Sequence, residues 1–286
     1  MDTLTTAPAD RARDIVRRAH GITPSASLLR IEEQLRRGDA STRQLAQLVE
    51  GSPALAARVL RMANSAFYAP VEPVVSLNRA IVMLGEMVLR QLVLTSLITS
   101  RGAGKRNPHQ ALASARLMGD AVRCATVGRH LAELSRVGSR DEVFVGALLH
   151  DLGHIYLLDE VGDDYATYLL EGRSGQDAFV REMALCGTTH TEVGAAFAVD
   201  WQLPGAVVAV LRDHHEPQPG TAAQVVWVAD RVVRELTAAA AGDPFATKAT
   251  DDGLAAIGVD RARWDERVPR VKEEYAELLT VFDAIA

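Results

Sequence analysis

The chain has 286 residues, enough for one large domain or two smaller ones, and a hydrophobic fraction of 48% supports a sizeable core. The net charge of −6 argues against a dedicated nucleic-acid binder. Two cysteines, Cys124 and Cys186, form no spaced motif, so we expect reduced, structural thiols. The N-terminus shows no signal peptide, and charged residues interrupt the best apolar stretch, 74–99. We therefore expect a cytoplasmic protein without a membrane partner.

Helix start and stop signals divide the first part of the chain into short helices. Residues 1–20 are polar and Arg-rich, which fits a short helix or a loosely held end, and a helix is expected over 27–37. Ser41 with Gln44 forms a capping box that opens a helix ending at Gly51. The pair Ser52-Pro53 supplies an N-cap and a first-turn proline for the next helix.

The following segment combines a loop, a break and a linker. Prolines within 68–76 indicate a loop, after which Ser76 caps a helix that Gly85 interrupts. A long apolar helix is expected over 86–100, followed by a Gly-rich basic linker at 101–109. We place a boundary between two parts of the molecule at this linker.

Helical periodicity continues through the second part of the chain, and no run alternates as a strand would. The sequence therefore predicts an all-α fold. Three capping boxes are expected to open helices there, at Ser139–Glu142, Thr189–Glu192 and Thr221–Gln224. The remaining helices are expected over 109–134, after Pro204, and over 261–285, while 159–176 is a mixed segment.

His150 and Asp151 lie side by side at the end of the apolar helix that Ser139 opens. Helical phase turns both side chains toward apolar neighbours, where a carboxylate and an imidazole are costly unless hydrogen bonds or a metal ion compensate. Gly153 is a plausible break, although the apolar pattern resumes at Ile155. The pair alone is weak evidence, because His-Asp dipeptides are common.

Further polar residues also occupy apolar helix faces, and four helices supply the whole set, as in metal sites built in bundle cores. Their imidazole and carboxylate groups suit Fe, Mn, Zn or Ni. For each residue singly, a hydrogen-bonded core residue remains the alternative. His154 stands at the spacing of a second ligand, but a solvent-facing His at a helix end is commoner, so it is left out. The predicted metal ligands are His150, Asp151, His190, His214, His215 and Asp230.

Three stretches resemble the HDOD family, a regulatory relative of the HD phosphohydrolases. They are SPALAARVLRMANSAFY, VSLNRAIVMLGEMVLRQLVL, and the combination of ALLHDLG, HTEVGAAFAVDWQLP and His214-His215. The resemblance covers roughly residues 22–236. It implies a two-lobed helical fold with an N-terminal lobe over 22–108 and an HD-like lobe over 109–236. Residues 1–21 and 237–286 are then an N-terminal and a C-terminal helical extension.

The resemblance implies a regulator in bacterial signalling, and three departures from the HD phosphohydrolases argue against catalysis. Asp120 stands where those enzymes carry an earlier His, His154 replaces their usual Lys, and no Gly-Tyr-Pro follows His215. We therefore assign no catalytic residue and expect a signalling protein as partner. A metal-dependent phosphohydrolase acting on a nucleotide or cyclic dinucleotide is the alternative, and a nucleic-acid-binding regulator is the weakest hypothesis.

The segment ANSAFY is the most specific element of the first stretch. Asn64 and Ser65 are candidates for a surface that binds a partner or a nucleotide. The structural alternative is that Asn64 ends a helix and its side chain caps the turn.

Overall fold

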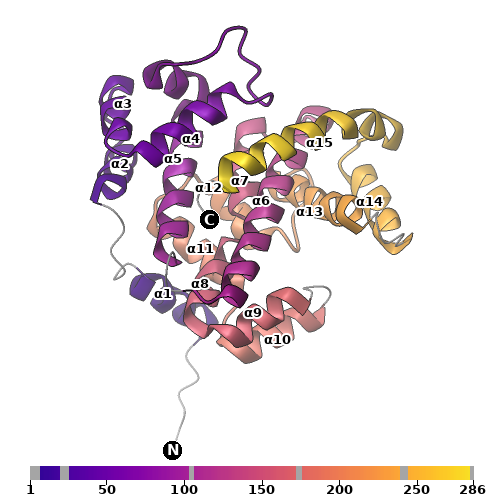
Figure 1. Ribbon diagram of the computed structural model, residues 1–286. Coiled ribbons are helices and arrows are strands. Elements are labelled where there is room, and N and C mark those ends of the chain that lie inside the picture. The colour runs from indigo at the N-terminus through magenta and orange to yellow at the C-terminus, as the bar shows by residue number, and fades with distance from the viewer. Residues whose placement is uncertain (1–6, 20–25, 103–105, 172–175, 239–243, 284–286) are drawn as a thin grey trace, which may run out of the picture. The chain divides into compact units, whose positions relative to one another are not determined.

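The computed structural model describes residues 7–19, 26–102, 106–171, 176–238 and 244–283. Every regular element in these ranges is a helix, which confirms the predicted all-α fold class (Figure 1). None of the described helices combines the length and apolar character that a bilayer crossing requires. The helices are α1 (Pro8–Ala19), α2 (Ala26–Arg37), α3 (Thr42–Glu50), α4 (Pro53–Asn64), α5 (Leu77–Gly102), α6 (Pro108–Ser135), α7 (Arg140–Leu149), α8 (Leu152–Val161), α9 (Asp163–Glu171), α10 (Gln176–Cys186), α11 (His190–Asp200), α12 (Gly205–Asp213), α13 (Ala222–Ala238), α14 (Pro244–Ala256) and α15 (Arg261–Asp283).

The helices form two compact units, each built from two separate parts of the chain. One unit combines residues 23–104 with 260–286 and holds α2 to α5 and α15. The other combines residues 1–22 with 105–259 and holds α1 and α6 to α14. The first helix thus belongs with the part that carries His150 and Asp151. The domain limits expected from the sequence stay predictions.

In the first unit, the predicted caps and breaks decide where helices begin and bend. Ser41 accepts a hydrogen bond from Gln44 N, and the Gln44 side chain accepts one from Ser41 N, so the capping box is formed. Gly85 has φ +77° and ψ 163° inside α5, a conformation that L side chains rarely adopt, and this confirms the expected break. α15 packs against α4, and Glu277 Oε2 accepts a hydrogen bond from Ala66 N at 2.6 Å.

Asn64 fastens the end of α4 to the loop that follows it. Its Nδ2 donates to Leu60 O at 2.9 Å and to Val74 O at 2.7 Å, and its Oδ1 accepts from Val74 N at 2.7 Å. Ser65 is buried, and its hydroxyl donates to Met62 O at 2.7 Å. These contacts favour the structural alternative for the pair, and a role in binding a partner or nucleotide stays a prediction.

The second unit is organised around α6, whose buried residues include Ala125, Val127 and Leu131. α7, α9 and α13 pack against α6, while α12 packs on both α7 and α13. α11 lies against α1, α8 and α12. Burial of this much apolar side-chain surface stabilises the bundle and fixes the helix ends that carry polar residues.

His150 and Asp151 occupy the joint between α7 and α8. The expected break at Gly153 is wrong, because this residue lies inside α8. Its lack of a side chain serves close packing instead: a Cβ there would come within 1.9 Å of His190 O. Gly153 therefore lets α8 approach the first turn of α11.

The sequence analysis did not predict two of the helices, and a third lies in a segment that it described only as mixed. α10 and α14 were not expected, and α9 covers Asp163–Glu171. The predicted box at Thr221 is half formed, because Thr221 Oγ1 accepts from Gln224 N at 3.3 Å but Gln224 Oε1 accepts from Gly220 N at 2.7 Å. The omission of α10 matters most, since this helix carries a buried carboxylate of the site.

Candidate metal centre

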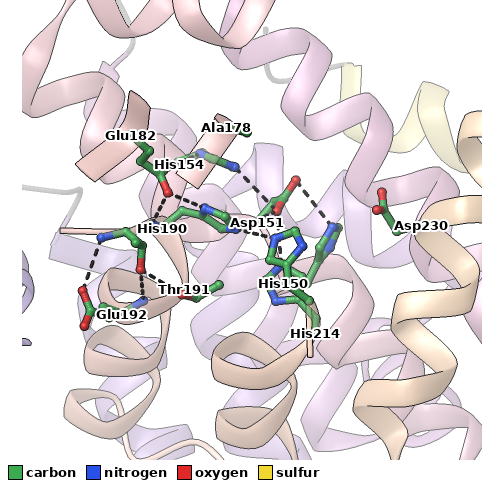
Figure 2. A network of polar contacts seen from close by, with 12 residues as sticks. His150, Asp151, His154, Ala178, Glu182, His190, Thr191, Glu192, His214 and Asp230 are labelled. Carbon is green, nitrogen blue, oxygen red and sulfur yellow. Dashed lines mark hydrogen bonds and ion pairs between the residues drawn. The ribbon is translucent and has the colours of Figure 1, made fainter. Parts of the chain in front are cut away.

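Four of the six predicted ligands converge in the second unit. One donor atom from each of Asp151, His190, His214 and His215 lies within 4.8 Å of the other three. Asp151 comes from the joint of α7 and α8, His190 is the first residue of α11, and the two other histidines follow the last turn of α12. Figure 2 shows the side chains of Asp151, His190 and His214 turned toward one another.

Local capping explains why His190 faces this centre. Thr189 Oγ1 accepts a hydrogen bond from Glu192 N at 3.3 Å, and Glu192 Oε2 accepts from Thr189 N at 3.3 Å, so the predicted capping box is formed. The box fixes the start of α11 at His190. Val193 and Phe197, one and two turns on, are buried on the same face.

The distances within the centre distinguish hydrogen bonds from looser contacts. Nε2 of His190 lies 2.9 Å from Nε2 of His215, which is hydrogen-bond distance. Oδ1 of Asp151 lies 3.8 Å from Nε2 of His190 and 3.7 Å from Nε2 of His214, which is too long for a hydrogen bond. The Asp151 carboxylate thus faces both imidazole nitrogens without forming a hydrogen bond to either of them.

The protonation of the histidines suits metal ligation. Burial, with the neighbouring imidazoles, lowers the pKa of His214 and holds the pKa of His215 far below its ordinary value. Both rings are therefore neutral at pH 7, the form that binds metals. Nε2 of His214 is buried without a hydrogen-bond partner, while its Nδ1 donates to Val210 O at 3.1 Å. An unpartnered buried nitrogen beside a carboxylate fits a divalent ion.

The other two predicted ligands lie at the edge of this group. Nδ1 of His150 donates to Ala147 O at 2.6 Å, and its Nε2 lies 3.5 Å from Asp151 Oδ2. Asp230 lines the same cavity, but its carboxylate forms an ion pair with Arg234 at 2.6 Å. In Figure 2 Asp230 stands apart from the dashed network. Neither residue belongs to the four-donor group.

Sequence reasoning missed Glu182 of α10 and set His154 aside, and both are buried at the centre. Oε2 of Glu182 accepts from Nδ1 of His190 at 2.8 Å, and Tyr165 OH donates to Oε1. Burial alone would raise the pKa of Glu182, but the interactions with His190 and His154 hold it well below its usual range. The carboxylate is therefore ionised. Phe179, Glu182 and Cys186 share one helix face, and this spacing was the available signal.

A cavity of about 740 Å³ opens beside the centre. Asp151, His190 and His215 line one part of it. Four arginines also line it: Arg116, Arg123, Arg231 and Arg234. Arg123 forms an ion pair with Asp120 at 3.3 Å, so this carboxylate of the cavity wall has a cationic partner.

Several solved structures share this fold. A candidate phosphohydrolase from Shewanella amazonensis SB2B has a TM-score of 0.69 at 20% identity, covering 99% of this chain and 100% of that one. An HDOD domain protein with unknown function from Geobacter sulfurreducens has a TM-score of 0.60 at 23% identity, covering 93% and 97%. A candidate signal transduction protein from Marinobacter aquaeolei VT8 has a TM-score of 0.66 at 20% identity, covering 98% of this chain and 66% of that one.

At these identities the likeness to solved structures concerns the fold. No curated protein matches the chain significantly in sequence. The HDOD domain family matches residues 22–217, which is more than half of the chain and includes the centre as far as His215. The chain therefore belongs to the HDOD domain family.

Proposed function

We propose that this HDOD protein is a regulatory signalling module whose centre binds one divalent metal ion in a structural or sensory role, without catalysis. The observation that carries the proposal is the four-donor group of Asp151, His190, His214 and His215. Sites that are purely structural take four protein ligands, whereas catalytic zinc sites keep one position for water. Four converging protein donors are thus typical of a closed site.

The donors come from the joint of α7 and α8, from the start of α11 and from the end of α12. A bound ion of the Fe, Mn, Zn or Ni type would supply a cross-link between these segments. Asp151 would contribute the negative charge, and the neutral imidazoles would contribute nitrogen lone pairs. The packing of α11 on α8 and α12 would then respond to whether the ion is present.

The contacts of three polar residues beside the four-donor group also support a non-catalytic role. Asp120 and Asp230 are each paired with an arginine on their own helix, which competes with any ligation by these carboxylates. His154 is buried, with Nδ1 2.6 Å from Tyr165 OH, so it offers no exposed cation to a phosphate. These contacts make each of the three side chains less available to a metal ion or a phosphate.

Two measurements on one preparation test the proposal. Protein purified without chelator or metal-binding tag is analysed for metal content, and its turnover of cyclic dinucleotides is assayed with added Mn²⁺ or Fe²⁺. We expect about one metal ion per chain and no turnover above the Asp151→Ala variant. Turnover that Asp151→Ala abolishes would overturn the non-catalytic role, and metal-free protein that takes up no added ion would overturn the metal site.

The four arginines of the cavity favour a second candidate, a phosphohydrolase or a nucleotide-binding protein. Arg231 stacks on Trp227, with its guanidinium 3.4 Å from the ring centroid, and Arg234 is half exposed. Guanidinium groups are well suited to phosphates. Tight binding of a nucleotide that Arg231→Gln weakens would favour this candidate, with or without turnover.

The signalling partner is a further part of the proposal, supported by membership of the HDOD family. The chain is used as bait in affinity capture with metal-loaded and chelator-treated protein. Enrichment of one signalling protein by the loaded form alone would support a sensory role. Capture that does not depend on the metal would restrict the ion to a structural role.

A further inference from the structure

We propose that the buried carboxylate of Glu182 is a positioning residue that fixes the ring orientation and tautomer of His190 for metal binding. The metal-binding half of this inference rests on the proposed function, whereas the tautomer half concerns the protein without metal. Glu182 lies on α10, outside the elements that supply the four donors.

Glu182 holds both the backbone and the ring of His190. Its Oε2 accepts from His190 N at 3.0 Å and from His190 Nδ1 at 2.8 Å. Because a carboxylate only accepts, Nδ1 of His190 must carry the proton. In the neutral ring, Nε2 then bears the lone pair, and this atom lies 2.9 Å from Nε2 of His215 and 3.8 Å from Oδ1 of Asp151.

The second oxygen of Glu182 is held as firmly as the first. Tyr165 OH donates to Oε1, and Nδ1 of His154 lies 2.6 Å from the same hydroxyl oxygen and 3.2 Å from Oε1. Since Tyr165 uses its proton toward Glu182, its oxygen accepts from Nδ1 of His154. Glu182 has no exposed surface, and the rings of His154 and His190 stack with centroids 3.9 Å apart. The carboxylate therefore has one orientation.

His154, Glu182 and His190 could also form a second metal site, because one potential ligand atom from each lies within 4.8 Å of the other two. Their hydrogen bonds argue against it. Nδ1, the ring nitrogen of His190 that contacts Glu182, donates its proton to that carboxylate and so offers no lone pair to an ion there. Tyr165 completes this hydrogen-bond network by joining His154 to Glu182. The network therefore holds His190 in place for the four-donor group. Histidine ligands commonly donate their other N–H to a carboxylate in this way, and loss of such a partner lowers metal affinity by about 10–100-fold.

The test compares Glu182→Gln with the wild type and with Glu274→Gln. Glu274 is a second buried acid, in the other unit, where it accepts from Arg270 Nε at 2.8 Å, so its variant controls for removal of a buried charge. Ring ¹⁵N shifts of His190 are measured by NMR in metal-free protein. Zn²⁺ affinity is measured by competition with a chromophoric chelator.

We expect His190 of the wild type to be in the Nδ1–H form. Glu182→Gln should give a mixture of tautomers, because an amide donates as well as accepts, and should weaken Zn²⁺ binding by about 10-fold or more. Glu274→Gln should change neither quantity. An Nε2–H form of His190 in wild-type protein would overturn the inference even if Glu182→Gln does not fold, as would unchanged Zn²⁺ affinity in a folded Glu182→Gln. Wild-type protein that binds no Zn²⁺ but shows the Nδ1–H form would refute the proposed metal site and leave the positioning role intact.

Discussion

Nε2 of His190 and Nε2 of His215 lie 2.9 Å apart, so one nitrogen must donate to the other. In the neutral form of His190, Nδ1 carries the proton that it donates to Glu182, so its Nε2 is the acceptor and His215 is the donor. The pair is therefore a hydrogen bond that a divalent ion would replace. Formation of the metal centre requires His215 to turn or change tautomer, while His190 is already oriented.

Added metal should stabilise the protein, since the ion binds the folded state and cross-links three helix ends. At 100 times the dissociation constant, the expected gain is about 2.7 kcal/mol in the free energy of unfolding. Melting curves with Zn²⁺, with Mn²⁺ and with chelator measure it. Asp151→Asn keeps the shape of the side chain but removes its charge, so the metal-dependent shift should be lost. An equal shift in Asp151→Asn would locate the ion elsewhere.

Gly153→Ala should disrupt the contact between α8 and α11. The added Cβ would meet His190 O at 1.9 Å, and the obstructing atom belongs to the backbone, so the helices must separate. Overpacking of this kind costs about 1–3 kcal/mol or more. Urea unfolding measures the loss, and Zn²⁺ affinity should fall as His190 moves. Gly205→Ala, with nothing within 4 Å of its Cβ, is the control and should be nearly neutral. A similar stability of the two variants would contradict this packing.

The residues that the sequence identified correctly are those whose role is local. The capping boxes at Ser41 and Thr189 and the break at Gly85 depend on neighbours within a few positions. Helical phase also predicted the inward direction of the His190 side chain, since phase within one helix needs no knowledge of other helices. Membership of the HDOD family supplied the fold.

The residues that the sequence did not identify depend on contacts between distant segments. Glu182 reads as an ordinary helix carboxylate until α10 is placed beside His154 and Tyr165. His154 reads as a solvent-facing residue until the same packing buries it. Asp230 has the inward phase of a ligand, but an ion pair with Arg234 on the next turn holds its carboxylate. Helical phase predicts the direction in which a side chain points but not the residue that it contacts.

Asn64→Ala should destabilise the first unit, because the amide forms three hydrogen bonds that join the end of α4 to the loop at Val74. The expected loss is about 1–2 kcal/mol, reduced by the partial exposure of the site. Chemical denaturation of Asn64→Ala and of a control variant, Asn78→Ala, measures this loss. Asn78→Ala changes an exposed residue of α5 and should stay within about 0.5 kcal/mol of the wild type. A loss of partner binding in Asn64→Ala without a loss of stability would favour the surface role instead.

Both cysteines should resist alkylation in the folded protein. Burial raises the pKa of Cys186 to about 12, with Glu182 adding to the effect, and raises the pKa of Cys124 well above its ordinary value. The thiolate is the reactive form, so at pH 8 little of either residue reacts, and labelling of Cys186 should rise about tenfold per pH unit while the fold persists. Iodoacetamide labelling followed by mass spectrometry measures both sites. Ala115→Cys places a thiol at an exposed position of α6 and should react at the rate of a free cysteine. Labelling of Cys186 at that rate at pH 8 would show that α10 opens in solution, and the support that Glu182 gives to His190 would then be transient.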